Sequence, residues 1–71
     1  MSALKSRNVR VGARRTSVRL EPELWAALEL IASREGSSVH QICTNLAADK
    51  ASIRGGLTSA LRVYIVQQLQ A

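Results

Sequence analysis

The hydrophobic and polar positions of residues 14–20, RRTSVRL, alternate with a period of two. Because successive side chains of a strand point to opposite sides, this alternation predicts a strand with one apolar face. A lone strand cannot satisfy its own backbone hydrogen bonds, and no second convincing strand follows in the chain. We therefore expect the same strand of a second copy to pair with it, antiparallel about a two-fold axis. The positions on its apolar face are Thr16, Val18 and Leu20.

Upstream of this strand the alternation is weaker. Val9 and Val11 keep the period of two until a Gly-Ala pair interrupts it. Residues 8–11 are therefore either an extension of the ribbon or part of a flexible arm. The domain organisation that we predict is a basic, flexible N-terminal arm over residues 1–13, followed by one folded domain over residues 14–71.

Three helices are predicted after the strand from their start and stop signals. Pro22 favours the first turn of a helix, and Gly36 is typical of the residue that follows a helix end. Ser38, followed three residues later by Gln41, fits the capping box that begins a helix. Apolar positions then recur at helical spacing in each segment. The predicted helices cover about residues 22–35, 38–48 and 57–70.

A chain of 71 residues is one small domain, and a core of this size is marginal for stability. Small domains commonly gain support from disulfides, a metal or a partner subunit. Cys43 has no second cysteine, and His40 has no metal-ligating neighbour at a suitable spacing. We therefore expect self-association. The predicted dimer core consists of Thr16, Val18, Leu20, Leu24, Leu28, Ile31, Val39, Ile42, Cys43 and Leu46.

The net charge of +5 is concentrated at the N-terminus. Residues 1–15 contain five basic residues and no acid, whereas residues 16–71 contain five of each. A basic segment on a neutral domain indicates a polyanionic partner such as DNA or RNA. The alternative is a tail that only improves solubility.

The sequence offers few residues for catalysis. It has one histidine, one cysteine, no glycine-rich phosphate loop and no Cys-x-x-Cys pair. We therefore expect no enzymatic activity, no catalytic residue, no metal, no cofactor and no small-molecule ligand. The lone cysteine and the lack of an apolar leader predict a cytoplasmic protein, and the apolar runs are too short to span a membrane.

Residues 15–47 resemble the Arc/MetJ/CopG ribbon-helix-helix superfamily. The segments RTSVRLEPELW and REGSSVHQI carry the resemblance, and the later LTSALRVYI resembles a short bacterial branch of that superfamily. The resemblance implies a mainly α fold with one short strand, in an intertwined homodimer whose strands form an intermolecular antiparallel ribbon. A third, C-terminal helix is then an addition, although LTSALRV itself resembles the start of the second helix of the family.

The resemblance also implies roles for individual residues. The ribbon of the family lies in the DNA major groove, where the outward side chains contact base edges. These positions correspond to Arg15, Ser17 and Arg19, and arginine can donate two hydrogen bonds to guanine. The family's phosphate clamp at the start of the second helix corresponds to Ser38, Val39 and His40, and we expect the basic arm to add phosphate contacts through Lys5, Arg7, Arg10 and Arg14.

The function that we expect is sequence-specific transcriptional regulation, as a repressor that binds double-stranded DNA as a homodimer or a higher assembly. Two alternatives stay open. In the first, the chain is an antitoxin whose C-terminal segment binds a toxin. In the second, it is a protein-interaction module whose third helix binds a partner and which binds DNA only nonspecifically. An ordered third helix disfavours the antitoxin, because such tails are commonly disordered when free.

Overall fold

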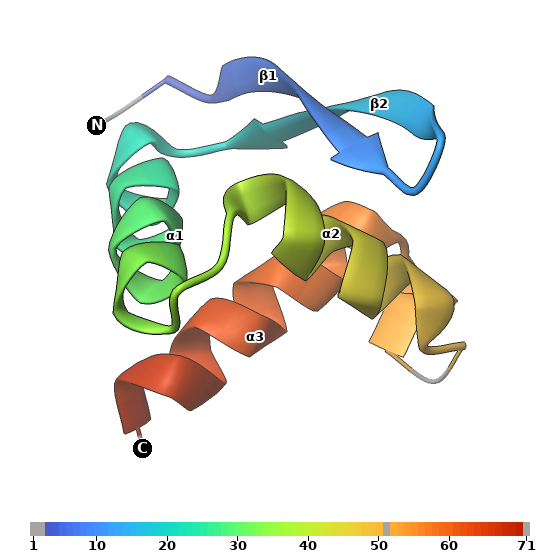
Figure 1. Ribbon diagram of the computed structural model, residues 1–71. Helices are drawn as coiled ribbons and strands as arrows, with labels where there is room; N and C mark the ends of the chain where they lie inside the picture. The colour runs from blue at the N-terminus through green and yellow to red at the C-terminus, as the bar shows by residue number, and fades with distance from the viewer. Residues whose placement is uncertain (1–2, 51, 71) are drawn as a thin grey trace.

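The computed structural model describes residues 3–50 and 52–70. A two-stranded antiparallel hairpin lies over a layer of helices (Figure 1). The fold is therefore a ribbon followed by helices, as the sequence predicts, with one strand more than expected. In chain order the elements are β1 (Lys5–Val11), β2 (Arg14–Leu20), α1 (Pro22–Arg34), α2 (Val39–Ala48), a short 3-10 helix (Ser52–Gly55) and α3 (Leu57–Gln70).

The second strand of the ribbon comes from the same chain, which corrects two expectations. Residues 5–11 of the predicted flexible arm form β1, while residues 1–2 of that arm lie outside the described residues. β1 pairs antiparallel with β2 along its whole length, from Lys5 opposite Leu20 to Val11 opposite Arg14. A single chain therefore forms the two-stranded ribbon, and a strand from a second copy is not needed to build it.

A two-residue turn at Gly12 and Ala13 joins the strands. Gly12 has a φ of +63°, whereas no residue other than glycine among those described has a positive φ. A positive φ at the first central position and a negative φ at the second are typical of a type II′ turn, whose twist matches that of a hairpin. The Gly12 amide also donates a hydrogen bond of 2.9 Å to Thr44 Oγ1 of α2. The Gly-Ala pair that interrupts the alternation is thus the hairpin turn.

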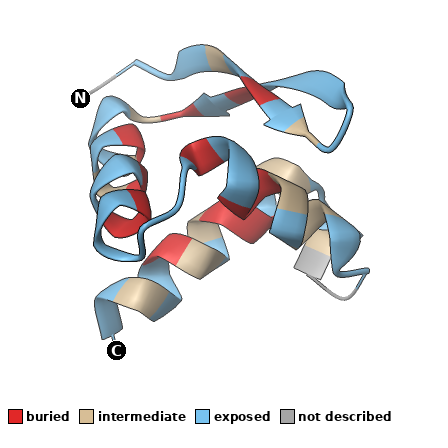
Figure 2. Ribbon diagram, in the orientation of Figure 1, coloured by how far each residue is buried: buried red, intermediate tan, exposed pale blue. Residues whose placement is uncertain are grey.

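The core lies between the inner face of the hairpin and the helices (Figure 2). Seven residues of the predicted dimer core are buried within one chain: Val18, Leu20, Leu28, Ile31, Val39, Ile42 and Cys43. Leu24 and Leu46 are partly buried, but Thr16 is exposed, contrary to the prediction. Thr16 lies near the turn and lines a hollow with Val11, Ile53 and Leu57, so the helices do not cover it completely. Most of these residues therefore form a core within one chain.

α3 is an integral part of the domain. It contacts α1, α2 and β2, and its Leu61 and Ile65 are fully buried. At the end of α1, Gly36 has a φ of +65°, and the Ser37 amide donates to the carbonyl of Ala32 as in a Schellman motif. This tight ending lets the chain reverse into α2. Within the described part of the chain, no helix has the length and apolar character required to cross a bilayer.

Candidate nucleic-acid interface

The strand register defines an outer face of the hairpin, directed away from the helices. Directly opposed residues of an antiparallel pair point to the same side, and every second pair lies on the same face. The inner face includes the buried Val9, Val18 and Leu20. The outer face therefore carries three cross-strand pairs: Ser6 with Arg19, Asn8 with Ser17, and Arg10 with Arg15.

The outer face is polar, basic and exposed. All six of its residues are exposed, and three of them are arginines. No acidic residue occurs anywhere in residues 5–20, which contain six basic residues. The three residues that the sequence assigned to base contacts, Arg15, Ser17 and Arg19, all lie on this face. The face can therefore offer hydrogen-bond donors and positive charge to a polyanion along its whole length.

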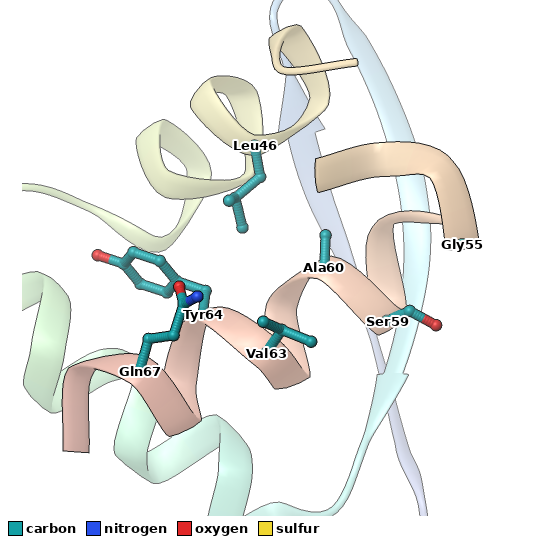
Figure 3. Close-up of a pocket in the computed structure, with 7 residues that line it drawn as sticks. All are labelled: Leu46, Gly55, Ser59, Ala60, Val63, Tyr64 and Gln67. Carbon is teal, nitrogen blue, oxygen red and sulfur yellow. The ribbon is translucent and has the colours of Figure 1, made fainter. Parts of the chain in front are cut away.

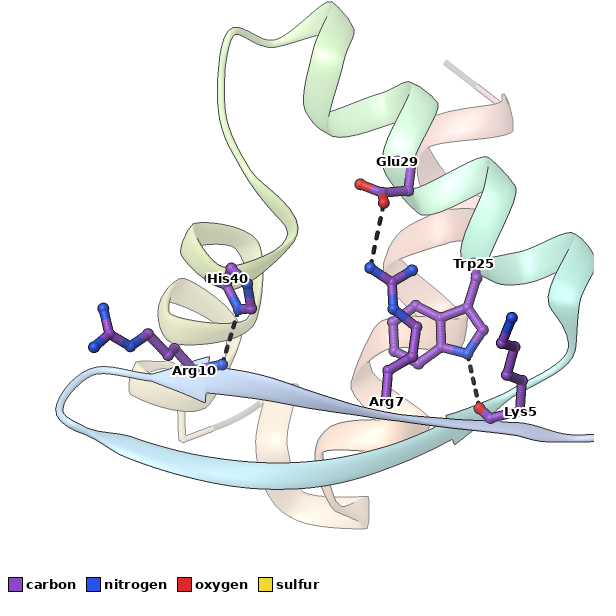
Figure 4. Close-up of polar contacts among 6 residues, drawn as sticks. All are labelled: Lys5, Arg7, Arg10, Trp25, Glu29 and His40. Atoms are coloured by element: carbon purple, nitrogen blue, oxygen red, sulfur yellow. Dashed lines mark hydrogen bonds and ion pairs between the residues drawn. The ribbon is translucent and has the colours of Figure 1, made fainter.

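The inner face is attached to α1 by a cluster around Trp25 (Figure 4). The Arg7 guanidinium stacks over the indole ring at 4.6 Å from its centroid and lies 3.3 Å from Glu29 Oε2. The indole Nε1 donates a hydrogen bond of 2.8 Å to the carbonyl of Lys5. Trp25 is only 3% exposed. This cluster holds the first half of β1 against the helices through stacking, charge and one hydrogen bond.

The predicted phosphate contacts of the arm therefore lie in different environments. Arg10 is on the outer face, as its assignment requires. Arg7 is on the inner face and is engaged by Trp25 and Glu29, so it is poorly placed for DNA bound at the outer face. Lys5 and Arg14 are exposed at the two ends of the inner register, away from the three outer pairs.

The start of α2 lies beside the outer edge of β1. The Arg10 amide donates to His40 Nδ1 at 3.0 Å, and Thr44 Oγ1 lies 3.4 Å from the Arg10 carbonyl (Figure 4 shows the His40 contact). Residues four apart on α2 thus cover an edge that would otherwise present free backbone groups. Asn8, Arg10, Arg15 and His40 line one hollow between the hairpin and α2. The helix start and the basic ribbon are therefore adjacent.

The predicted phosphate clamp is only partly as expected. Ser38 is the N-cap of α2, and its Oγ accepts a hydrogen bond of 3.1 Å from the Gln41 amide. Gln41 does not complete a capping box, because its side chain donates to Asn45 instead. The side chain of Val39 is buried, so this residue can offer an anion only its backbone amide. The first-turn amides of Val39 and His40 have no earlier helical carbonyl to pair with.

Two other features bear on function. Cys43 is fully buried, and this burial raises the pKa of its thiol to about 11, so it is protonated at neutral pH and disfavoured as a nucleophile. No group of three or more metal-ligating side chains occurs among the residues that the structure describes. A groove between α2 and α3 is lined by uncharged residues (Figure 3): Leu46, Gly55, Ser59, Ala60, Val63, Tyr64 and Gln67.

The fold and the basic ribbon define a small ribbon-and-helix domain. Residues 4–69 match the family described as the ribbon-helix-helix domain, and the chain belongs to this family, whose members are typically DNA-binding regulators. The chain is also similar to the solved structure of an uncharacterized protein from Bordetella pertussis Tohama I, with 38% identity and a TM-score of 0.75. That match covers 97% of this chain but only 59% of the other. A comparison with curated proteins gives no match.

The sequence prediction missed three residues of the outer face as candidates for base contacts. Ser6 and Asn8 were assigned no role, and Arg10 was assigned to phosphate. The missed signal is the position of Gly12, because a two-residue turn there fixes which residues of 5–11 oppose those of β2. Once the register is known, the outward residues of β1 follow from the period of two.

Proposed function

We propose that this protein is a transcriptional repressor that binds specific sites on double-stranded DNA, with the outer face of its hairpin in the major groove. A two-stranded β-ribbon fits the width of this groove. In the proposal Arg15 and Arg19 donate to guanine, and Ser17 contacts a base between them. Membership of the ribbon-helix-helix family supports the DNA-binding class, and the arrangement of side chains on the ribbon supports base contacts.

The observation that carries the proposal is the pairing of Arg10 with Arg15. Like charges directly opposite in an antiparallel pair are destabilising. The Arg10 amide donates to His40 rather than to β2, so this is a non-hydrogen-bonded pair, in which opposed side chains lie closest. An anion between or beside the two guanidinium groups would remove the repulsion. DNA offers both phosphates and guanine acceptors at such a position.

The start of α2 supplies the second element of the proposal. Phosphates bind readily at a helix N-terminus, because free amides and the helix dipole both favour an anion there. The amides of Val39 and His40 lie at this end, and His40 is fixed to the edge of β1. A DNA phosphate bound there would fix the register of the ribbon in the groove.

The proposal also includes a homodimer, a higher assembly on DNA and a cytoplasmic bacterial protein without catalytic activity. A second copy would place a second ribbon on DNA rather than complete the first. The homodimer would then give two binding sites related by the symmetry of the pair. Sedimentation of the free protein tests it, because a monomer at all concentrations would contradict this part of the proposal.

The antitoxin alternative has less support. A toxin-binding tail is commonly disordered when free, whereas Leu61 and Ile65 of α3 are part of the core. The groove between α2 and α3 is the place where an interaction module would dock a partner. It carries no feature that selects one partner, so we do not extend the proposal to it.

Fluorescence anisotropy at one stated salt concentration near physiological tests the proposal. The duplexes are the DNA upstream of the protein's own gene and a scrambled duplex of equal length. We expect the native DNA to bind about 100-fold more tightly or better, because specific sites typically exceed nonspecific ones by 10³ or more. Equal, weak binding to both duplexes and to fragments of the remaining genome would contradict sequence-specific regulation.

Two arginine variants separate base contacts from net charge. Arg19→Ala removes a proposed guanine contact, and we expect it to weaken binding to the specific site by about 1–3 kcal/mol. Arg54→Ala removes the same charge from an exposed residue of the 3-10 helix, which is not part of the hairpin. An equal loss for both variants would mean that only the total charge matters.

A further inference from the structure

We propose that Asn8 is a specificity-determining residue that selects an adenine at the centre of the site bound by one chain. This inference rests on the proposed function, because it names a base contacted by the same outer face. It comes from β1, the strand that was expected to be a flexible arm. The outer face thus has six candidate base contacts from two different strands instead of three repeated by symmetry.

The position of Asn8 is the first argument. Asn8 opposes Ser17 in the middle pair of the outer face, between the Ser6–Arg19 pair and the Arg10–Arg15 pair. The middle pair has an outer pair on each side, so it lies at the centre of the face that would enter the groove. Asn8 also lines the hollow that it shares with Arg10, Arg15 and His40, beside the start of α2. A base edge at this position would therefore be close to the proposed phosphate contact.

The second argument is the hydrogen-bonding capacity of the side chain. Among residues 3–50 and 52–70, the side-chain amide of Asn8 has no partner, whereas the hydroxyl of the opposing Ser17 lies 2.7 Å from Ser6 Oγ. An exposed asparagine offers one acceptor and two donors in one plane. Adenine presents the matching donor N6 and acceptor N7 in the major groove, and asparagine can bond to both. Guanine and the pyrimidines lack this pattern, so Asn8 discriminates against them.

The third argument is the asymmetry of the face. In a ribbon made by two identical strands, both strands present the same side chains, and the bound site is a palindrome. Here β1 presents Ser, Asn and Arg outward, and β2 presents Arg, Ser and Arg. The two-fold axis through the middle pair would exchange Asn8 with Ser17, which are different residues. The site contacted by one chain is therefore not palindromic, and the Asn8 contact occurs once in it.

Selection from a random duplex library with the full chain tests this inference. Wild type, Asn8→Ala and the control Asn45→Ala are compared at the same salt concentration, after circular dichroism shows that each is folded. Asn45 is an exposed asparagine on α2, so the control loses the same side chain away from the outer face. We expect a wild-type motif in which the site bound by each chain has one adenine position, favoured by about 5- to 150-fold over other bases.

The outcomes separate the inference from the proposed function. In Asn8→Ala the preference at the adenine position should fall to nearly equal binding of all four bases, while the guanine positions and the whole Asn45→Ala motif stay unchanged. A wild-type motif that Asn8→Ala leaves intact would overturn the role of Asn8 and keep the proposed function. If wild type selects no motif at all, the proposed function itself fails.

Discussion

The inner and outer faces of the hairpin use arginine in opposite ways. On the inner face, Arg7 stacks on Trp25 and pairs with Glu29, so its charge is compensated and its stem is packed. On the outer face, Arg10 and Arg15 oppose each other, and residues 5–20 provide no acid. The contacts of Arg7 stabilise the fold, whereas the repulsion between Arg10 and Arg15 destabilises it. A count of basic residues cannot make this distinction, because it depends on the strand register.

Removing the ring of Trp25 should break the inner face and have the largest effect. Trp25→Ala removes a side chain that is 3% exposed, together with the stacking of Arg7 and the bond to Lys5. We expect a loss of about 3–5 kcal/mol in the free energy of unfolding, measured by urea denaturation. Trp25→Phe keeps an aromatic ring but loses the hydrogen bond, and we expect it to lower the free energy of unfolding by about 1 kcal/mol. Losses below about 1 kcal/mol for Trp25→Ala would contradict the role of this cluster.

Changing the turn should disturb both faces, because the turn sets their register. Gly12→Ala places a Cβ at a φ of +63°, and we expect a loss of about 1–2 kcal/mol in the free energy of unfolding. Apart from atoms of residue 12 and its two chain neighbours, no atom lies within 4 Å of that Cβ, so the loss comes from the backbone and not from a clash. D-Alanine at the same position, introduced by chemical synthesis, favours a positive φ and should restore stability. Equal free energies of unfolding for the proteins with L-alanine and D-alanine at position 12 would contradict a turn with a positive φ at this position.

Neutralising one outer arginine should change stability and DNA binding in opposite directions. Arg15→Gln relieves the repulsion with Arg10, and we expect the free energy of unfolding to rise by about 0.2–1 kcal/mol at low salt. The same change should weaken specific DNA binding. For comparison, Arg7→Gln should lower stability, because this arginine has partners. Destabilisation by Arg15→Gln would show that the outer pair is not strained in the free protein.

The smallest effect is expected for Glu21, which forms an ion pair with Arg62. A hydrogen bond from its own backbone and the ion pair with Arg62, whose Nη1 lies 2.9 Å from Oε1, hold the pKa of Glu21 below its usual value of 4.5. Since the folded pKa is the lower one, the stabilisation is complete above pH 4.5 and is lost as the pH falls through the folded pKa. Glu21→Gln should be less stable than wild type at neutral pH, and the difference should shrink in urea titrations at about pH 3. A constant difference would rule out this linkage.

Much of the architecture could be predicted from local signals. The alternation of RRTSVRL marked β2, and Pro22, Gly36 and Ser38 marked the ends of helices where the structure has them. These residues act through their own backbone geometry or through neighbours within a few positions. Such signals need no knowledge of tertiary contacts.

β1 could not be recognised in the same way, because two of its inward positions are Lys5 and Arg7. They break the apolar pattern, and only the contact of Arg7 with Trp25, far along the chain, explains how an arginine is accommodated on the inner face. Thr16 was misassigned for a related reason, since the burial of its side chain depends on where the 3-10 helix and α3 lie. The candidate site inherited the first error: the outward residues of β2 were placed on the correct face, but those of β1 were missed.

The central claim is that one chain completes the ribbon that carries the proposed DNA contacts. Asn8 and Ser17 form a pair of the close, non-hydrogen-bonded type, because that type alternates along the strands and includes Arg10–Arg15. A nuclear Overhauser effect between their Hα protons should therefore be strong. In a mixture of isotope-labelled and unlabelled protein, refolded together, we predict that this signal arises within single chains and never between a labelled and an unlabelled chain. Its appearance between labelled and unlabelled chains would show that the strands pair across copies and would contradict the account.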